Sequence, residues 1–124
     1  MYNDLFILLA LLFVKHWYVD FVNQSMDEVQ SKGNYGQWLG IRHSLKQGIG
    51  TFLVFFLTDT YLIECIVLGA IDFILHYHID WAKMNLNAKM GWGPNTHEQF
   101  WWLLGLDQFL HAVTYILLVA LVTP

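Results

Sequence analysis

The chain has 124 residues, of which 56% are hydrophobic and 13% are charged, and its formal net charge is −4. Soluble domains carry about 25% charged residues, and a soluble fold of this length has too little interior to hide so many apolar side chains. The composition therefore indicates a single integral membrane domain over residues 1–124, and it excludes a basic nucleic-acid-binding module. The single cysteine, Cys65, excludes a disulfide framework.

Hydrophobic stretches along the chain predict an all-α protein, a bundle of four transmembrane helices. The first, third and fourth stretches reach the ~20 residues that a bilayer requires. The second is apolar only over residues 48–57. It reaches the required length only if the amphipathic stretch that begins at residue 37 belongs to the same helix. The predicted spans cover residues 2–22, 37–57, 60–81 and 100–122.

The connections between the spans have recognisable turn and capping signals. Residues 25–28 read Ser-Met-Asp-Glu, the S-x-x-E form of a capping box, which predicts a short amphipathic helix after the first span. Residues 33–36 and 91–94 are rich in glycine and predict turns. The connection at residues 58–60 is too short for anything but a tight antiparallel hairpin between the second and third spans.

The basic residues predict how the bundle is oriented. All of them lie at or beside the two longer connections, whereas the two termini and the short hairpin have none. Cytoplasmic loops carry an excess of Lys and Arg, so we expect both longer connections, including the short amphipathic helix, to lie in the cytoplasm and both termini outside. The basic residues are Lys15, Lys32, Arg42, Lys46, Lys83 and Lys89.

Histidine and aspartate recur four residues apart in three of the predicted spans. Residues at this spacing project within ~40° of one another, so each set occupies one helix face. An ionisable group at the centre of a membrane helix costs about 3 kcal/mol, which makes such a face a candidate functional site. The sets are His16 and Asp20, then Asp72, His76 and Asp80, and finally Asp107 and His111.

With the predicted topology, all of these residues fall in the cytoplasmic half of the bundle, together with His43. Imidazole and carboxylate ligands suit zinc first, with iron or manganese as alternatives, and the lack of thiolate ligands argues against copper(I). The ligands outnumber those of one tetrahedral zinc, so two ions remain open. A hydrogen-bonded polar core and an ion or proton pathway are alternatives to a metal. The predicted metal ligands are His16, Asp20, His43, Asp72, His76, Asp80, Asp107 and His111.

These motifs resemble those of the domain-of-unknown-function family 3307, small polytopic membrane proteins of bacteria and phages. The resemblance implies a place in the bacterial inner membrane and a distant similarity to membrane-bound metal-dependent hydrolases. The family motifs do not include Asp72, and residues 29–40 do not align with them. The matching motifs are H-x-x-x-D-F-x-x-Q at His16, Asp20, Phe21 and Gln24, a histidine at His43, H-x-x-x-D-x-x-K at His76, Asp80 and Lys83, and D-Q-x-x-H at Asp107, Gln108 and His111.

Two functions follow as expectations. The first is a metal-dependent hydrolase that acts on a membrane lipid or its headgroup at the cytoplasmic leaflet. Its general base would be Asp80 or Asp107, and Lys83 would stabilise developing negative charge. The second is a non-catalytic module that binds a host membrane protein and uses the polar cluster as a structural core. A homo-oligomer also remains open, because glycines at 48, 50 and 69 allow close helix packing.

Overall fold

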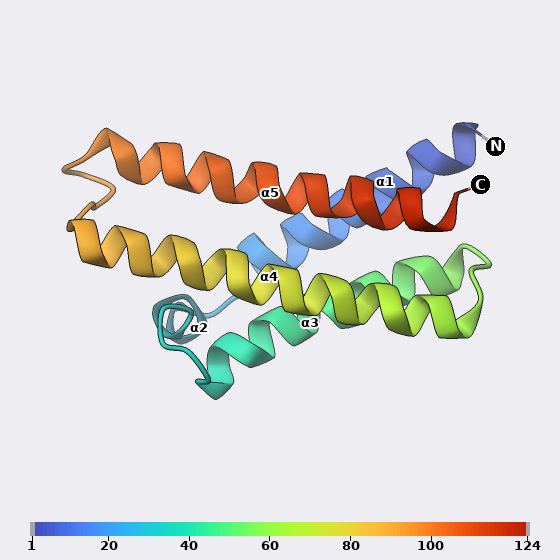
Figure 1. Cartoon of the computed structure of the whole chain (residues 1–124), viewed down its shortest axis with the longest axis horizontal. Helices are drawn as coiled ribbons and strands as arrows, with labels where there is room; N and C mark the ends of the chain where they lie inside the picture. Colours follow the sequence, from blue (N-terminus) through green and yellow to red (C-terminus); the bar gives the residue numbers. More distant parts are fainter. Residues whose placement is uncertain (1, 124) are drawn as a thin grey trace.

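The computed structural model describes the backbone of residues 2–123 and the side chains of residues 4–123, and every regular element in this part is helical (Figure 1). The all-α prediction is therefore confirmed. The elements are α1 (Tyr2–Trp17), the π-helical turn η1 (Tyr18–Val22), α2 (Met26–Ser31), α3 (Trp38–Leu57), α4 (Leu62–Met90) and α5 (Glu98–Val122).

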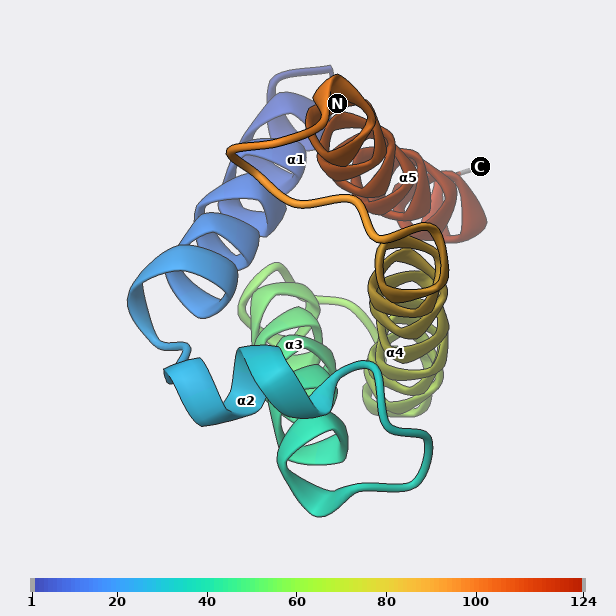
Figure 2. The same ribbon diagram turned by 90° about the vertical axis from the view of Figure 1, so that its left-hand side faces the viewer.

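The four long helices form a ring in which each contacts two neighbours. α4 packs against α3 on one side and α5 on the other, and α1 closes the ring between α3 and α5 (Figures 1 and 2). Both termini and the α3–α4 turn lie at one end, which we call the terminal end. The other end holds α2 and the α4–α5 connection, and we call it the loop end. This is the up-and-down arrangement that the connections predict.

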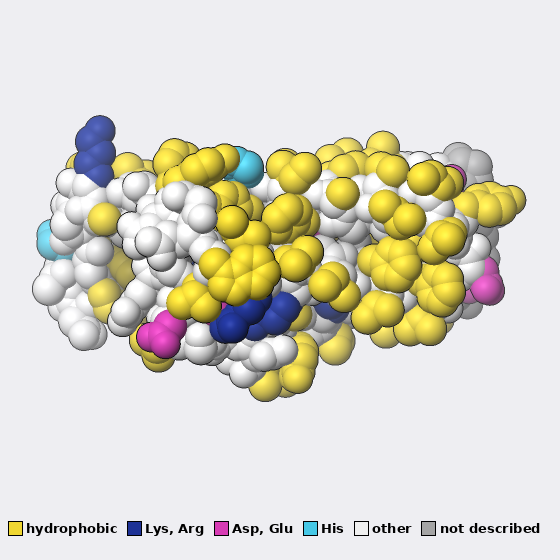
Figure 3. All heavy atoms as spheres, turned by 90° about the horizontal axis from the view of Figure 1, so that it is seen from below, with side chains coloured by type: hydrophobic (Ala, Val, Ile, Leu, Met, Phe, Trp, Pro, Cys, Tyr) yellow, Lys and Arg dark blue, Asp and Glu magenta, His cyan; other side chains and the backbone are white. Residues whose placement is uncertain are grey.

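Three helical segments in the described part are long and apolar enough to cross a membrane: Asp4–Val22, Leu62–Met90 and Glu98–Val122. The prediction of four spans is corrected on this point. α3 has 20 residues, but its first half carries Arg42, Lys46 and a buried His43. These residues make α3 too polar to be counted among the membrane-spanning helices. Figure 3 shows the face on which α2 and α3 lie, where charged side chains gather toward the loop end and hydrophobic ones cover the terminal half.

Helix α2 is held over the start of α3 by a buried carboxylate. The predicted capping box is present: the Ser25 hydroxyl accepts from the Glu28 N–H at 3.2 Å, and the Glu28 carboxylate accepts from the Ser25 N–H at 3.1 Å. Arg42 and Lys46 of α3 also donate to Glu28, at 2.9 and 3.0 Å. Burial raises the pKa of Glu28, but the hydrogen bonds from Lys46, Ser25 and Arg42 outweigh it and hold the pKa below its ordinary value.

Glycines set the distance between α3 and α4. A Cβ atom on Gly48 would lie 2.7 Å from the carbonyl oxygen of Gly69, and one on Gly69 would lie 2.8 Å from that of Gly48. The two backbones therefore touch, as at other close helix contacts in membranes. A Cβ on Gly50 would lie 2.6 Å from Cγ of Lys15, so this position admits the lysine stem into the bundle.

The end of α4 lies well past the predicted limit of residue 81, at Met90. Lys83 and Asn87 end the hydrophobic stretch, but they are compatible with a helix and continue it. Gly91, with a φ of 69°, ends the helix in the left-handed conformation that glycine adopts most readily. The predicted turn at 91–94 is thus confirmed, and the helix before it carries Lys83 toward the interior.

Candidate metal centre

All of the predicted metal ligands are buried inside the bundle. Each is at most 7% exposed, and His43 and His76 are completely enclosed. They come from α1, η1, α3, α4 and α5, so the whole ring contributes. The helical spacing explains this placement, because one face of each helix carries its polar residues inward. His78, which this spacing places on another face of α4, is exposed and contacts the Tyr35 hydroxyl at 3.0 Å.

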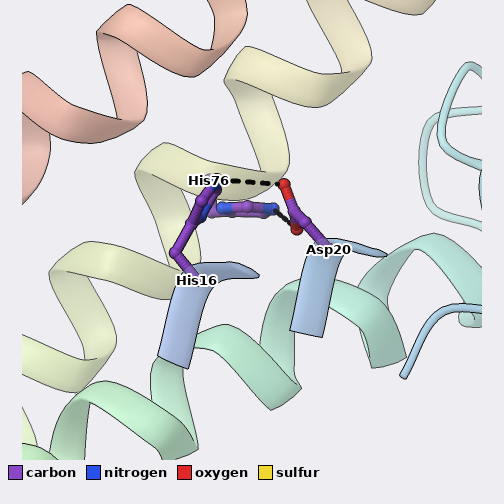
Figure 4. A group of neighbouring side chains, drawn as sticks. All are labelled: His16, Asp20 and His76. Carbon is purple, nitrogen blue, oxygen red and sulfur yellow. Dashed lines mark ion pairs between the residues drawn. The ribbon is translucent and has the colours of Figure 1, made fainter. Parts of the chain in front are cut away.

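A π-helical turn presents Asp20 to the cluster. The Asn23 N–H donates to the carbonyl oxygen of Tyr18 at 2.7 Å, which widens the last turn after α1. Such turns occur often at functional sites. Asp20 directs Oδ2 toward Nε2 of His16 at 3.3 Å and Oδ1 toward Nε2 of His76 at 3.3 Å, as Figure 4 shows.

His43 of α3 and His76 of α4 form the centre of the cluster. Their Nε2 atoms lie 3.1 Å apart, and Oδ2 of Asp80 lies 3.6 Å from the first and 3.2 Å from the second. Oδ1 of Asp20 lies 3.0 and 3.3 Å from the same two nitrogens. Ligands of a tetrahedral zinc with bonds of about 2.0–2.1 Å are separated by ~3.3 Å. The two nitrogens and either carboxylate oxygen therefore form a triangle of about the size of one face of a metal coordination tetrahedron.

The cluster continues from Asp80 to α5. Oδ1 of Asp80 lies 3.3 Å from Nε2 of His111, which lies 3.4 Å from Oδ1 of Asp107. Asp80 and Asp20 thus each direct one oxygen toward His43 and His76, and the other oxygen lies near His111 for Asp80 and near His16 for Asp20. Three groups with metal-ligand spacing result, linked through His76 and Asp80. They are His16, Asp20 and His76; His43, His76 and Asp80; and Asp80, Asp107 and His111.

Asp72 lies outside these three groups within the described residues, although the sequence places it on the same face as His76. Its carboxylate lies 2.8 Å from Nζ of Lys15 and accepts a hydrogen bond from the Thr51 hydroxyl. Lys15 also donates to Gln47 at 2.7 Å, and Gln47 donates to Asp20 at 2.8 Å. Asp72 is therefore connected to the cluster through a chain of hydrogen bonds that orients Asp20.

Lysine side chains balance the carboxylates. Nζ of Lys32 lies 2.8 Å from Asp80, and Nζ of Lys83 lies 3.0 Å from Asp107. Sequence reasoning placed Lys83 in the site but missed Lys15 and Lys32, because it used their charges only to orient the bundle. The position of Lys15 inside an apolar helix, directly before His16, was a usable signal. Lys32 directly follows the short helix α2, and no local sequence pattern indicates that its side chain points into the bundle.

His16 differs from His43 and His76 in the hydrogen bonds that its ring nitrogens make. Both ring nitrogens of His16 have neutral partners at 2.8 Å, the Tyr115 hydroxyl and the Gln108 carbonyl oxygen. Within the described residues, Nδ1 of His43, Nδ1 of His76 and Oδ1 of Asp107 are buried without a hydrogen-bond partner. The His43–His76 pair therefore makes its polar contacts through Nε2 alone, toward the two aspartates.

The formal charge of the cluster limits how many ions it can hold. Its four carboxylates and three ammonium groups leave a charge of −1 when the imidazoles are neutral. One divalent cation changes this to +1, and two would change it to +3. Uncompensated charge is costly in a low-dielectric interior. The donor set therefore fits one divalent ion better than two.

Comparisons with known proteins agree with the motifs. No match was found among curated proteins or solved structures. One family, described as "Protein of unknown function (DUF3307)", matches residues 8–124, a range that includes the complete His/Asp cluster. The resemblance carried by the four motifs is thereby confirmed, and the chain belongs to the DUF3307 family.

Proposed function

We propose that this protein binds one divalent transition-metal ion inside a membrane-embedded helix bundle. His43 and His76 would bind it through Nε2, and Asp20 and Asp80 would complete the donor set. The convergence of the two Nε2 atoms to 3.1 Å between two carboxylates carries the proposal. Two nitrogen and two oxygen donors suit zinc best, with iron or manganese as alternatives.

More specifically, we propose that the protein is a metal-dependent hydrolase that acts on a lipid or its headgroup. A bound ion would supply a Lewis acid beside the substrate. Asp80 would be a ligand of the ion, so Asp107 is the predicted candidate that remains for the general base, and its Oδ1 is buried without a hydrogen-bond partner in the described residues. Lys83, 3.0 Å from Asp107, would stabilise negative charge that develops nearby.

The membrane setting of the proposal follows from the helices and the charges. Asp4–Val22, α4 and α5 would cross the bilayer, and α3 would complete the bundle beside them. The basic residues near the loop end favour a cytoplasmic loop end and external termini, in the bacterial inner membrane. The metal centre would then lie in the cytoplasmic leaflet, within reach of lipid headgroups.

A structural polar core is the second candidate function. Lys15, Lys32 and Lys83 already pair with buried aspartates, and a single proton would neutralise the cluster. In this case the protein would be a non-catalytic membrane module, and a second copy or a host membrane protein would be its partner. Metal content separates the two candidates.

The test is elemental analysis by inductively coupled plasma mass spectrometry of the full chain purified in detergent. We expect stoichiometric zinc, iron or manganese in the wild type and its loss in His76→Gln. The matched control is His78→Gln, because His78 lies on the same helix but is exposed. Wild-type protein that is folded by circular dichroism, free of metal and unable to take up added zinc would overturn the metal proposal in favour of the structural core.

A further inference from the structure

A cavity of about 160 Å³ lies beside the metal centre toward the loop end. It is bounded by η1, α4, α5 and the residues around α2, so its wall includes the segment that the family motifs do not cover. Its apolar lining includes Phe21 and Phe100, and Phe21 is 59% exposed at the surface of the bundle. The polar side chains that line it are Asp20, Gln24, Lys32, Lys83, Asn87 and Gln108.

Two ammonium groups line this cavity from different elements. Lys32 follows α2, and Lys83 lies on α4. Each is largely buried, and each contacts a carboxylate of the cluster, Asp80 for Lys32 and Asp107 for Lys83. An ammonium group has three N–H donors, so both lysines retain donors for a ligand in the cavity.

Unpartnered acceptors line the same cavity. Asn87 is only 8% exposed, and its Oδ1 is buried without a hydrogen-bond partner in the described residues. Oε1 of Gln24 is likewise buried without a hydrogen-bond partner in the described residues. A buried acceptor without a donor is costly. The cavity therefore offers two cationic donors and two neutral acceptors to one small ligand, and the Asp20 carboxylate is the anionic group in its lining.

We propose that this cavity binds a phosphate group beside the metal centre, either free or as the headgroup of a lipid. The phosphate oxygens would accept from Lys32 and Lys83, and a hydroxyl of the phosphate or of an attached glycerol would donate to Asn87. Water occupies about 30 Å³ in the liquid, so 160 Å³ holds a phosphate but not a complete lipid. An acyl chain would leave past Phe21. This substrate class rests on the proposed function: one bound divalent ion brings the cluster to +1, which the negative charge of a phosphate offsets, whereas phosphate without the ion would add to the −1 of the cluster.

The test measures binding of two probes to the full chain in detergent, before and after loading with zinc. Inorganic phosphate represents the free ligand and dihexanoyl phosphatidic acid the lipid, with chloride at equal ionic strength as the reference. Thermal unfolding followed by tryptophan fluorescence gives the apparent affinity. We expect at least one probe to stabilise the wild type, and its affinity to fall about 10- to 100-fold in Lys83→Met and in Asn87→Asp.

The control is Lys89→Met, since Lys89 is an exposed lysine on the same helix. Asn87→Asp adds a repelling charge without removing a buried ion pair, so it remains informative if Lys83→Met does not fold. Stabilisation by phosphatidic acid alone assigns the site to a lipid, and by inorganic phosphate alone to a free ligand. No stabilisation by either probe, or equal affinity in Asn87→Asp, Lys89→Met and wild type, would overturn the proposal. Phosphate binding in protein that takes up no zinc would sink the metal function and leave the phosphate site standing.

Discussion

The Nε2 atoms of His43 and His76 lie 3.1 Å apart in the interior of the bundle, and both side chains are completely buried. A neutral imidazole carries one N–H, so at most one hydrogen bond can join two such nitrogens. One oxygen of Asp20 and one of Asp80 lie 3.0–3.6 Å from these nitrogens. This arrangement attracts a proton or a metal cation.

Added metal should stabilise the wild-type protein. Ligand binding to the folded state alone contributes about 2.7 kcal/mol when the free ligand is at 100 times its dissociation constant. We therefore expect zinc to raise the unfolding temperature of chelator-treated protein, and His43→Gln to abolish the increase. Differential scanning fluorimetry with and without zinc measures this. An equal increase in His43→Gln would show that zinc binds elsewhere.

The ion pair between Lys32 and Asp80 should show strong coupling. Asp80→Ala leaves a buried ammonium group without its partner and should lower the free energy of unfolding by about 3–5 kcal/mol. Removing Lys32 in the same chain should recover part of this loss, because the uncompensated charge is gone. A double-mutant cycle by denaturant unfolding in mixed micelles measures the coupling. Strictly additive losses would contradict the buried pair.

The contact between Gly48 and Gly69 should tolerate no side chain. Gly48→Ala forces a methyl group against a backbone carbonyl and should cost about 1–3 kcal/mol of stability. Gly105→Ala on α5 is the matched control, because a Cβ there has no neighbouring atom of the described residues within 4 Å. That control should be neutral or gain about 0.5–1 kcal/mol from helix propensity. Unfolding in mixed micelles compares them, and equal effects would argue against the close backbone contact.

The docking of α2 should weaken in acid. The pKa of Glu28 lies below its ordinary value, so its contribution to stability is present above the unfolded pKa of about 4.3 and is lost as the pH falls through the folded value. Hydrogen exchange of residues 26–31 at pH 7 and pH 3 measures this, and the protection factor, which compares each rate with the intrinsic rate at the same pH, should fall at the lower pH. Glu28→Gln should remove most of the pH dependence. Asp27→Asn, at an exposed neighbour, should retain it.

Spacing along the chain was sufficient to predict which side of each helix faces the interior. His16 and Asp20, like Asp107 and His111, are four residues apart, and both pairs are buried as expected. The capping box at Ser25 and the break at Gly91 are local signals, and both are present. The extension of α4 beyond residue 81 could not be predicted from hydrophobicity, because polar residues such as Asn87 end an apolar stretch without ending a helix.

The sequence by itself determined the all-helical class, the family and the inward faces, because helical periodicity and capping act within a few residues of one chain. Tertiary structure decided the rest. It paired Asp72 with Lys15 and brought Lys32 to Asp80. These contacts depend on the rotation and offset of one helix against another. Close packing at Gly48 and Gly69 constrains both for α3 and α4, and the spacing of residues within a single helix does not predict them.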